Sequence, residues 1–253
     1  MFTNVIVKKP GKSYLSGLTT SDLGKPDYEL LLTQHERYVK ALEKCGVAVT
    51  ELAASEEFPD STFVEDAAVL TPNFAVITNP GAESRNAETV EIEAVAKTFY
   101  RKFYFIQAPG TLDGGDILQA DDHFYIGISE RTNEEGAKQL KEILESENYY
   151  ATIIPLKEFF HLKTGIAYLG NNQMIVAGEF VSHPAFNSYE KIVIGKEDEY
   201  SANCIQVNDY VIIPSGFPET NRKLTDAGYQ TIELDMSEVQ KHDGGLSCLS
   251  LRF

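Results

Sequence analysis

Apolar and polar residues alternate along the chain in four stretches that share one plan. Each stretch has a β-type apolar run, a short polar turn and a second apolar run, which is the pattern of a β-hairpin. The sequence therefore predicts four hairpins. Their turns are expected at Pro72-Asn73, Asp121-Asp122, Asn171-Asn172 and Asn208-Asp209.

A helical spacing of apolar residues follows three of the hairpins. One helix is expected to begin near Asn86, with Val90 and Val95 on its apolar face. A second is expected to begin at Thr132, which forms a capping box with Glu135. The third is expected from Thr220 to Gly228, and a fourth helix, before the first hairpin, fits residues 28–45.

Short β-type runs come after several of these helices, at residues 47–52, 103–108, 151–156 and 231–236. The repeating unit is therefore strand, strand, helix, strand, at about 45 to 55 residues per copy. The first copy has only one strand before its helix, at residues 4–9, and residues 246–253 can supply the missing one.

An α/β ring of such repeats, closed by pairing the N- and C-terminal strands, leaves no exposed sheet edge at the closure. The alternative is an open mixed sheet. Residues 1–253 are expected to form a single domain, since the repeats run through the whole chain.

Composition narrows the choice of partners and compartment. The formal net charge is −16, and such a surface repels phosphate backbones, so nucleic acid is not an expected partner. No apolar run is long enough for a membrane span, and the N-terminal lysines follow the apolar stretch, which is the wrong order for a signal peptide. We expect a cytoplasmic protein. The three cysteines lack the spacing of a disulfide framework or a zinc site.

Polar residues of the kinds used in catalysis and ligand binding occur where the hairpins begin. In a radial repeat, equivalent positions converge at the centre. The helix entries add two arginines in the same place, Arg85 and Arg131. The hairpin entries FPDSTFVED, TLDGGD, FFHLKTG and HDGGLSC carry Asp60, Glu65, Asp66, Asp113, Asp116, His161 and Cys248.

Each of these residues has an ordinary structural alternative. A lone cysteine is more often a packed apolar residue, a lone histidine beside phenylalanines is more often part of a core, and aspartates near Pro or Gly usually form turns. The combination points to a ligand with two charged ends. Carboxylates bind a guanidinium, arginines bind a carboxylate, and a Cys–His pair beside a guanidinium suggests nucleophilic attack on its central carbon.

The segments named above, together with GLTTSDLGKPDYE, NPGAESR, FYIGISERTNEEG and SANC, resemble in order the dimethylarginine dimethylaminohydrolases of the guanidino-group-modifying (pentein) superfamily. The resemblance covers nearly the whole chain. It implies a five-bladed α/β propeller of ββαβ-type repeats, which agrees with the repeat found in the pattern.

The resemblance also implies roles for individual residues. Cys248 matches the nucleophile, His161 the general acid and base, and Asp113 a carboxylate that orients the histidine or binds the guanidinium. The substrate-binding residues implied by the family are Asp60, Glu65, Asp66, Arg85 and Arg131, with the backbone carbonyls of Leu18 and His242 receiving the α-amino group.

The implied reaction converts Nω,Nω-dimethyl-L-arginine and water to L-citrulline and dimethylamine, with no metal or organic cofactor. Two alternatives stay open: another guanidino or ureido hydrolase of the superfamily, such as an arginine deiminase, and a non-catalytic relative of similar fold. The expected partner is a small methylated arginine, and a homodimer is one open choice of oligomeric state.

Overall fold

The computed structural model describes residues 1–253, which divide into two compact units. The first comprises residues 1–64 and 203–253 and holds two three-stranded sheets. The second comprises residues 65–202 and holds three such sheets. The strands form five separate sheets of three strands, so the alternative of one open mixed sheet is wrong.

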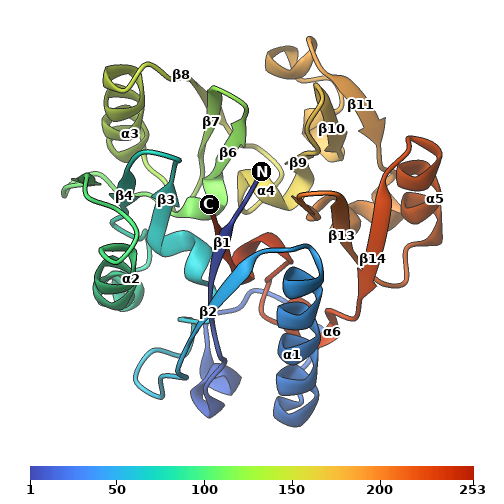
Figure 1. Cartoon of the computed structure of the whole chain (residues 1–253), viewed down its shortest axis with the longest axis horizontal. Coiled ribbons are helices and arrows are strands. Elements are labelled where there is room, and N and C mark those ends of the chain that lie inside the picture. The colour runs from blue at the N-terminus through green and yellow to red at the C-terminus, as the bar shows by residue number, and fades with distance from the viewer. The chain divides into compact units, whose positions relative to one another are not determined.

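Every sheet is built from a central strand with one antiparallel and one parallel neighbour (Figure 1). In the first unit the strand orders are β15-β1-β2 and β12-β13-β14, and in the second they are β3-β4-β5, β6-β7-β8 and β11-β10-β9. The strands are β1 Asn4–Lys8, β2 Ala48–Leu52, β3 Ala68–Leu70, β4 Ala75–Ile77, β5 Phe103–Phe105, β6 Ile117–Ala120, β7 His123–Ile128, β8 Tyr150–Pro155, β9 Ile166–Tyr168, β10 Gln173–Val176, β11 Glu190–Val193, β12 Ile205–Val207, β13 Tyr210–Pro214, β14 Gln230–Leu234 and β15 Leu251–Arg252.

All four predicted hairpins are present, and their turn residues explain why. In the β6–β7 hairpin Ala120 pairs with His123, so Asp121 and Asp122 form a two-residue turn. Asp121 and Asn208 adopt positive φ angles of 54°, a conformation that short Asx side chains tolerate. These turns set the register of each antiparallel pair.

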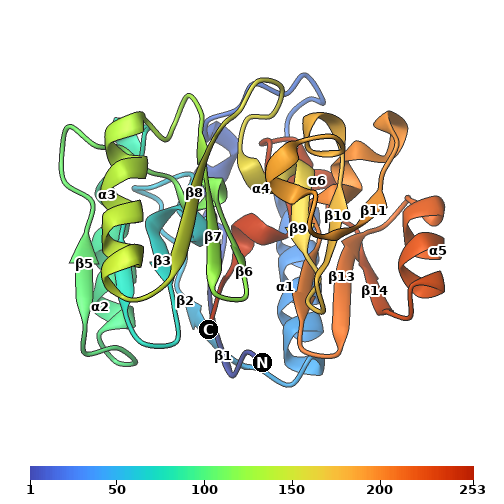
Figure 2. The same cartoon turned by 90° about the horizontal axis from the view of Figure 1, so that it is seen from above.

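Helices connect the central strand of a sheet to its parallel neighbour, as the ββαβ unit predicts. Figure 2 shows α3 lying along β8, and Leu140 and Leu144 on its inner face are fully buried. The β9–β10–β11 sheet differs, because only short 3₁₀ turns join β10 to β11, and β11 was not predicted. The helices are α1 Tyr28–Lys44, α2 Glu88–Ala96, α3 Glu134–Ser146, α4 Leu162–Gly165, α5 Pro218–Asp226 and α6 Ser237–Gln240.

Two helices differ in detail from their predictions. In α2 the buried face carries Ile92 and Ala96, while Val90 is 66 % exposed, so the predicted apolar face was wrong. In α3 the N-cap is Asn133, whose side chain accepts the N–H of Gly136, rather than Thr132. Thr132 is fully buried and accepts the backbone N–H of Asp113 instead. None of the helices combines the length and hydrophobicity needed to cross a membrane.

The two chain ends pair within the first unit, as predicted. β15 is antiparallel to β1, with Val5 opposite Arg252, and the backbone of Phe253 bonds to Asn4 on both sides. Cys248 does not lie on this strand; it lies in a 3₁₀ helix, Ser247–Leu249, directly before it. The terminal strand therefore anchors the turn that carries the cysteine.

Candidate active site

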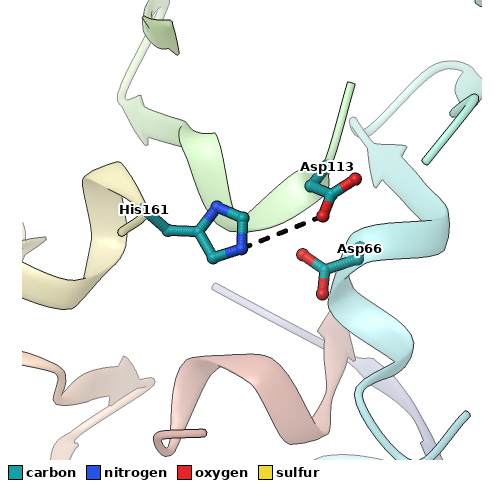
Figure 3. A group of neighbouring side chains, drawn as sticks. All are labelled: Asp66, Asp113 and His161. Carbon is teal, nitrogen blue, oxygen red and sulfur yellow. Dashed lines mark ion pairs between the residues drawn. The ribbon is translucent and has the colours of Figure 1, made fainter. Parts of the chain in front are cut away.

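In the second unit, His161 faces two aspartates from separate segments (Figure 3). Its Nε2 atom lies 3.8 Å from Oδ2 of Asp113, and Asp66 completes the group. Asp113 is fully buried, and its other oxygen accepts the N–H of Gly81 at 2.7 Å. Asp66 accepts the N–H of Gly115 at 2.9 Å. Three residues that were predicted to work together are thus brought together.

A third aspartate lies on the other side of the histidine ring. Asp116 Oδ1 is 3.2 Å from Nδ1 of His161. Gly115, beside Asp116, leaves room for the histidine ring, because a Cβ added there would lie 3.1 Å from Cγ of His161 and 3.1 Å from Oδ1 of Asp66. The sequence pattern placed Asp116 among the converging acids, but the family resemblance assigned it no role.

The electrostatics of this cluster favour a charged histidine. Burial opposes the charge on His161, but the carboxylates of Asp116, Asp66 and Asp113 outweigh it and raise its pKa to about 9. Burial, reinforced by Asp66, raises the pKa of Asp113 to about 6. Burial also opposes ionisation of Asp66, yet Arg85 and His161 hold its pKa below the ordinary value. His161 is therefore poised to donate a proton at neutral pH.

Arg85 is buried beside this cluster and forms two ion pairs. Its Nη1 atom is 2.7 Å from Asp66, and Nη2 is 2.9 Å from Glu88, the residue three positions further along the chain. These carboxylates raise the pKa of Arg85 despite its burial. The i, i+3 spacing of Arg85 and Glu88 is a sequence signal that could have predicted this pair.

Two further predicted residues have partners that the sequence did not indicate. Glu65 pairs with Lys163 at 2.6 Å, and both side chains are largely buried. The guanidinium carbon of Arg131 lies 5.2 Å from the ring centre of Phe160, a cation–π arrangement. Lys163 and Phe160 lie close to His161 in the segment FFHLKTG. This segment therefore supplies the histidine and also contacts to Glu65 and Arg131.

Asp66, Asp113 and His161 are also the described group that could hold a metal ion, since one atom from each lies within 4.8 Å of the others. A metal ion binds the neutral form of histidine, whereas the pKa of His161 is raised to about 9, so at neutral pH its proton competes with a metal ion for the ring nitrogen.

In the first unit, Cys248 lies on a turn that three side chains hold by its backbone. Asn203 accepts the N–H of Ser247 at 3.0 Å, and Arg252 donates to the carbonyl of the same residue at 3.3 Å. The hydroxyl of Tyr38 donates to the carbonyl of Leu246 at 2.8 Å. The cysteine is partly exposed, whereas the residues around it are buried. Such a turn presents the thiol in a fixed place.

The other two cysteines are unsuited to nucleophilic chemistry. Burial raises the pKa of Cys45 to about 11 and that of Cys204 to about 12. A buried thiol that resists ionisation is a poor nucleophile. Both side chains are buried, which fits a packing role.

The remaining predicted residues, Leu18, Asp60 and His242, are neighbours in the first unit. Asp60 accepts the N–H of Leu18 at 3.0 Å. The ring of His242 stacks on Tyr14, with ring centres 4.4 Å apart, and its burial lowers its pKa. The loop of residues 11–27 is therefore held by two hydrogen bonds. One is donated by the N–H of Leu18 to Asp60, and the other by the N–H of Thr20 to Asp243.

A family model described as arginine deiminase matches residues 55–211. A Pseudomonas aeruginosa protein named N(G),N(G)-dimethylarginine dimethylaminohydrolase is 50 % identical over 254 aligned residues, which cover all of both chains. A Streptomyces coelicolor protein of the same name is 32 % identical and covers 98 % of this chain and 95 % of its own.

Solved structures show the same relationship. A Pseudomonas aeruginosa enzyme of this kind, a cysteine-to-serine variant complexed with citrulline, matches with a TM-score of 0.99 and 50 % identity over the whole of both chains. The N-terminal domain of a cyanobacterial arginine dihydrolase matches in fold, with a TM-score of 0.88 at 17 % identity over 98 % of this chain and 97 % of that chain.

These likenesses and the five three-stranded sheets confirm the predicted pentein fold class. The alignment with 50 % identity covers the whole of both chains. The chain belongs to the dimethylarginine dimethylaminohydrolase family.

Proposed function

We propose that this chain hydrolyses Nω,Nω-dimethyl-L-arginine to L-citrulline and dimethylamine, and Nω-methyl-L-arginine to L-citrulline and methylamine. The observation that carries the proposal is the full-length identity of 50 % to a dimethylarginine dimethylaminohydrolase, a structure of which holds citrulline. The carboxylate cluster around His161 supports it, because such a cluster suits a cationic guanidinium.

Cys248 is the nucleophile and His161 the general acid and base of the proposed reaction. The thiolate forms a bond to the guanidinium carbon. The bond to dimethylamine then breaks as His161 gives that nitrogen a proton, which leaves a thiouronium. The pKa of about 9 supports this step, since His161 holds a proton at neutral pH.

Hydrolysis of the thiouronium completes the cycle. Neutral His161 takes a proton from water, and the water oxygen bonds to the carbon. The carbon–sulfur bond breaks and regenerates the thiolate and charged His161. The hydroxyl proton left on citrulline passes to solvent, where it balances protonation of the released amine.

The substrate-binding roles follow the family pattern. We assign the guanidinium to Asp66 and Asp113, with Asp60 and Glu65 as further binding acids, and the α-carboxylate to Arg85 and Arg131. Arg131 contributes more than Arg85, because Asp66 and Glu88 already neutralise the charge of Arg85. The backbone carbonyls of Leu18 and His242 receive the α-amino group. A single catalytic domain, a cytoplasmic location and any homodimer stay predictions.

Separate incubations with dimethylarginine, arginine and citrulline test the proposal by assay of dimethylamine and ammonia. We expect dimethylamine from dimethylarginine and much slower release of ammonia from arginine. Cys248→Ala should abolish turnover, whereas the matched variant Cys45→Ala should keep it. Comparable ammonia release from arginine would favour a deiminase, the activity named by the family model, and no turnover of any substrate would favour a non-catalytic protein.

A further inference from the structure

Asp116 ends the 3₁₀ helix Gly114–Asp116, and its side chain is completely buried. Its Oδ1 atom lies 3.2 Å from Nδ1 of His161 and accepts the backbone N–H of Leu162 at 3.1 Å. One carboxylate oxygen therefore faces both the ring of His161 and the peptide that follows it. The hydrogen bond to Leu162 fixes this oxygen beside Nδ1 of His161, within ion-pair distance of the ring.

The carboxylate of Asp116 is itself held in place. Its Oδ2 atom accepts the hydroxyl of Ser129 at 2.7 Å. The Ser129 oxygen also accepts the backbone N–H groups of Arg131 and Thr132, at 3.0 and 3.1 Å. The support behind the histidine is therefore continuous with the turn that carries Arg131.

The two nitrogens of the His161 ring face different acids. Nδ1 has the shorter contact, with Asp116, while Nε2 faces Asp113 across 3.8 Å (Figure 3). The other oxygen of Asp113 accepts the N–H of Gly81. A carboxylate beside one imidazole nitrogen favours the tautomer that carries its proton on that nitrogen.

We infer that Asp116, rather than Asp113, is the positioning residue for His161, and that it holds Nδ1 so that Nε2 gives and takes the protons of the reaction. The catalytic part of this inference rests on the proposed function. In the neutral ring we expect the proton on Nδ1, the nitrogen that lies 3.2 Å from Asp116 and has no other partner. The charged groups that face the ring are Asp116, Asp66 and Asp113, and the first is closest.

Asp116→Asn tests the inference, with Asp122→Asn as the matched control in the exposed turn of the β6–β7 hairpin. We expect Asp116→Asn to lower kcat for dimethylarginine about 10- to 100-fold while KM stays within about threefold. Nitrogen-15 NMR of the imidazole should show the neutral ring of the wild type protonated on Nδ1. In Asp116→Asn we expect a lower ring pKa and a shift of the proton toward Nε2.

Unchanged kcat, tautomer and ring pKa in Asp116→Asn would overturn the inference. If that variant does not fold, Ser129→Ala provides the test, because it frees the same carboxylate to rotate and keeps its charge. We expect the tautomer to shift in the same direction, and an unchanged tautomer would overturn the inference. The NMR measurement needs no substrate, so failure of the proposed reaction in the wild type is distinguishable from failure of this assignment.

Discussion

Cys248 lies on a turn whose backbone is held by hydrogen bonds, whereas His161 lies among buried carboxyl groups. The partners of the cysteine turn are an amide, a phenol and a guanidinium that donates to carbonyl and hydroxyl oxygens. The histidine cluster has three aspartates and a buried arginine.

The difference shows how the two groups meet different requirements. The backbone of the cysteine turn is fixed by hydrogen bonds to Asn203 and Tyr38, and these bonds depend little on pH. A group that transfers protons needs a suitable pKa, and at His161 the nearby carboxylates raise the pKa against the effect of burial. The stability of the first region should therefore be insensitive to pH, and that of the second should vary with it.

Removal of the buried guanidinium of Arg85 should have the largest effect on the free energy of unfolding. Arg85→Met leaves Asp66 and Glu88 buried without their partner, so we expect a loss of about 3–5 kcal/mol in the free energy of unfolding. Urea unfolding at pH 7 measures it. Arg222→Met removes similar ion pairs on the surface and should leave the stability close to that of the wild type. Equal losses in both variants would show that burial does not set the strength of the cluster.

The second largest effect should be the pH dependence of the free energy of unfolding, which distinguishes the His161 cluster from the cysteine turn. The folded-state pKa of His161, about 9, lies above its ordinary value of 6.5. The stabilisation is therefore complete below pH 6.5 and is lost as the pH rises through 9, by about 3 kcal/mol in total. Denaturant unfolding between pH 6.5 and 9 measures the loss. We expect it in the wild type and not in His161→Asn, which lacks the titrating ring.

His123→Asn is the control for this measurement. Burial lowers the pKa of His123, so its charge change falls below pH 6.5 and it should not contribute to the loss between pH 6.5 and 9. A wild type and a His161→Asn variant that lose stability in parallel would contradict the raised pKa.

The cysteine turn should respond to loss of its amide partner. Asn203 is buried, and Asn203→Ala leaves the N–H of Ser247 without its acceptor, at a cost of about 1–3 kcal/mol. We expect this loss to be the same at pH 6.5 and pH 9, as measured by urea unfolding. Asn86→Ala, at an exposed position, is the control. A loss that varies strongly with pH would remove the contrast between the two regions.

The smallest expected effect is local. Glu56 accepts the N–H groups of Lys12 and Ser13, both at 2.8 Å, at the start of the loop of residues 11–27. Glu56→Ala should raise hydrogen exchange at these two amides and leave the unfolding midpoint unchanged.

In the wild type, citrulline should reduce hydrogen exchange across residues 11–27 if this loop closes over the ligand. Equal exchange with and without citrulline would show that residues 11–27 do not close over the ligand.

The periodic features of the fold were predictable from the sequence. Asx residues between two apolar runs predicted the hairpins, and Asp27 and Gly46 marked the ends of α1 to within a residue or two. The apolar face of α2 was not predictable, because its alanines and valines give no strong helical period and the packing of Ile92 decided which face is buried.

The sequence by itself determined the repeat, the pairing of the chain ends and the set of candidate residues, because alternation, turn chemistry and motif order are local properties of the chain. Only the tertiary structure decided which acid contacts which nitrogen of His161, that Lys163 pairs with Glu65, and that Asn203 holds the cysteine turn. These contacts join segments far apart in the sequence. Differences of less than an ångström between them, such as 3.2 and 3.8 Å at the two ring nitrogens, arise from the packing of the segments, which no local pattern specifies.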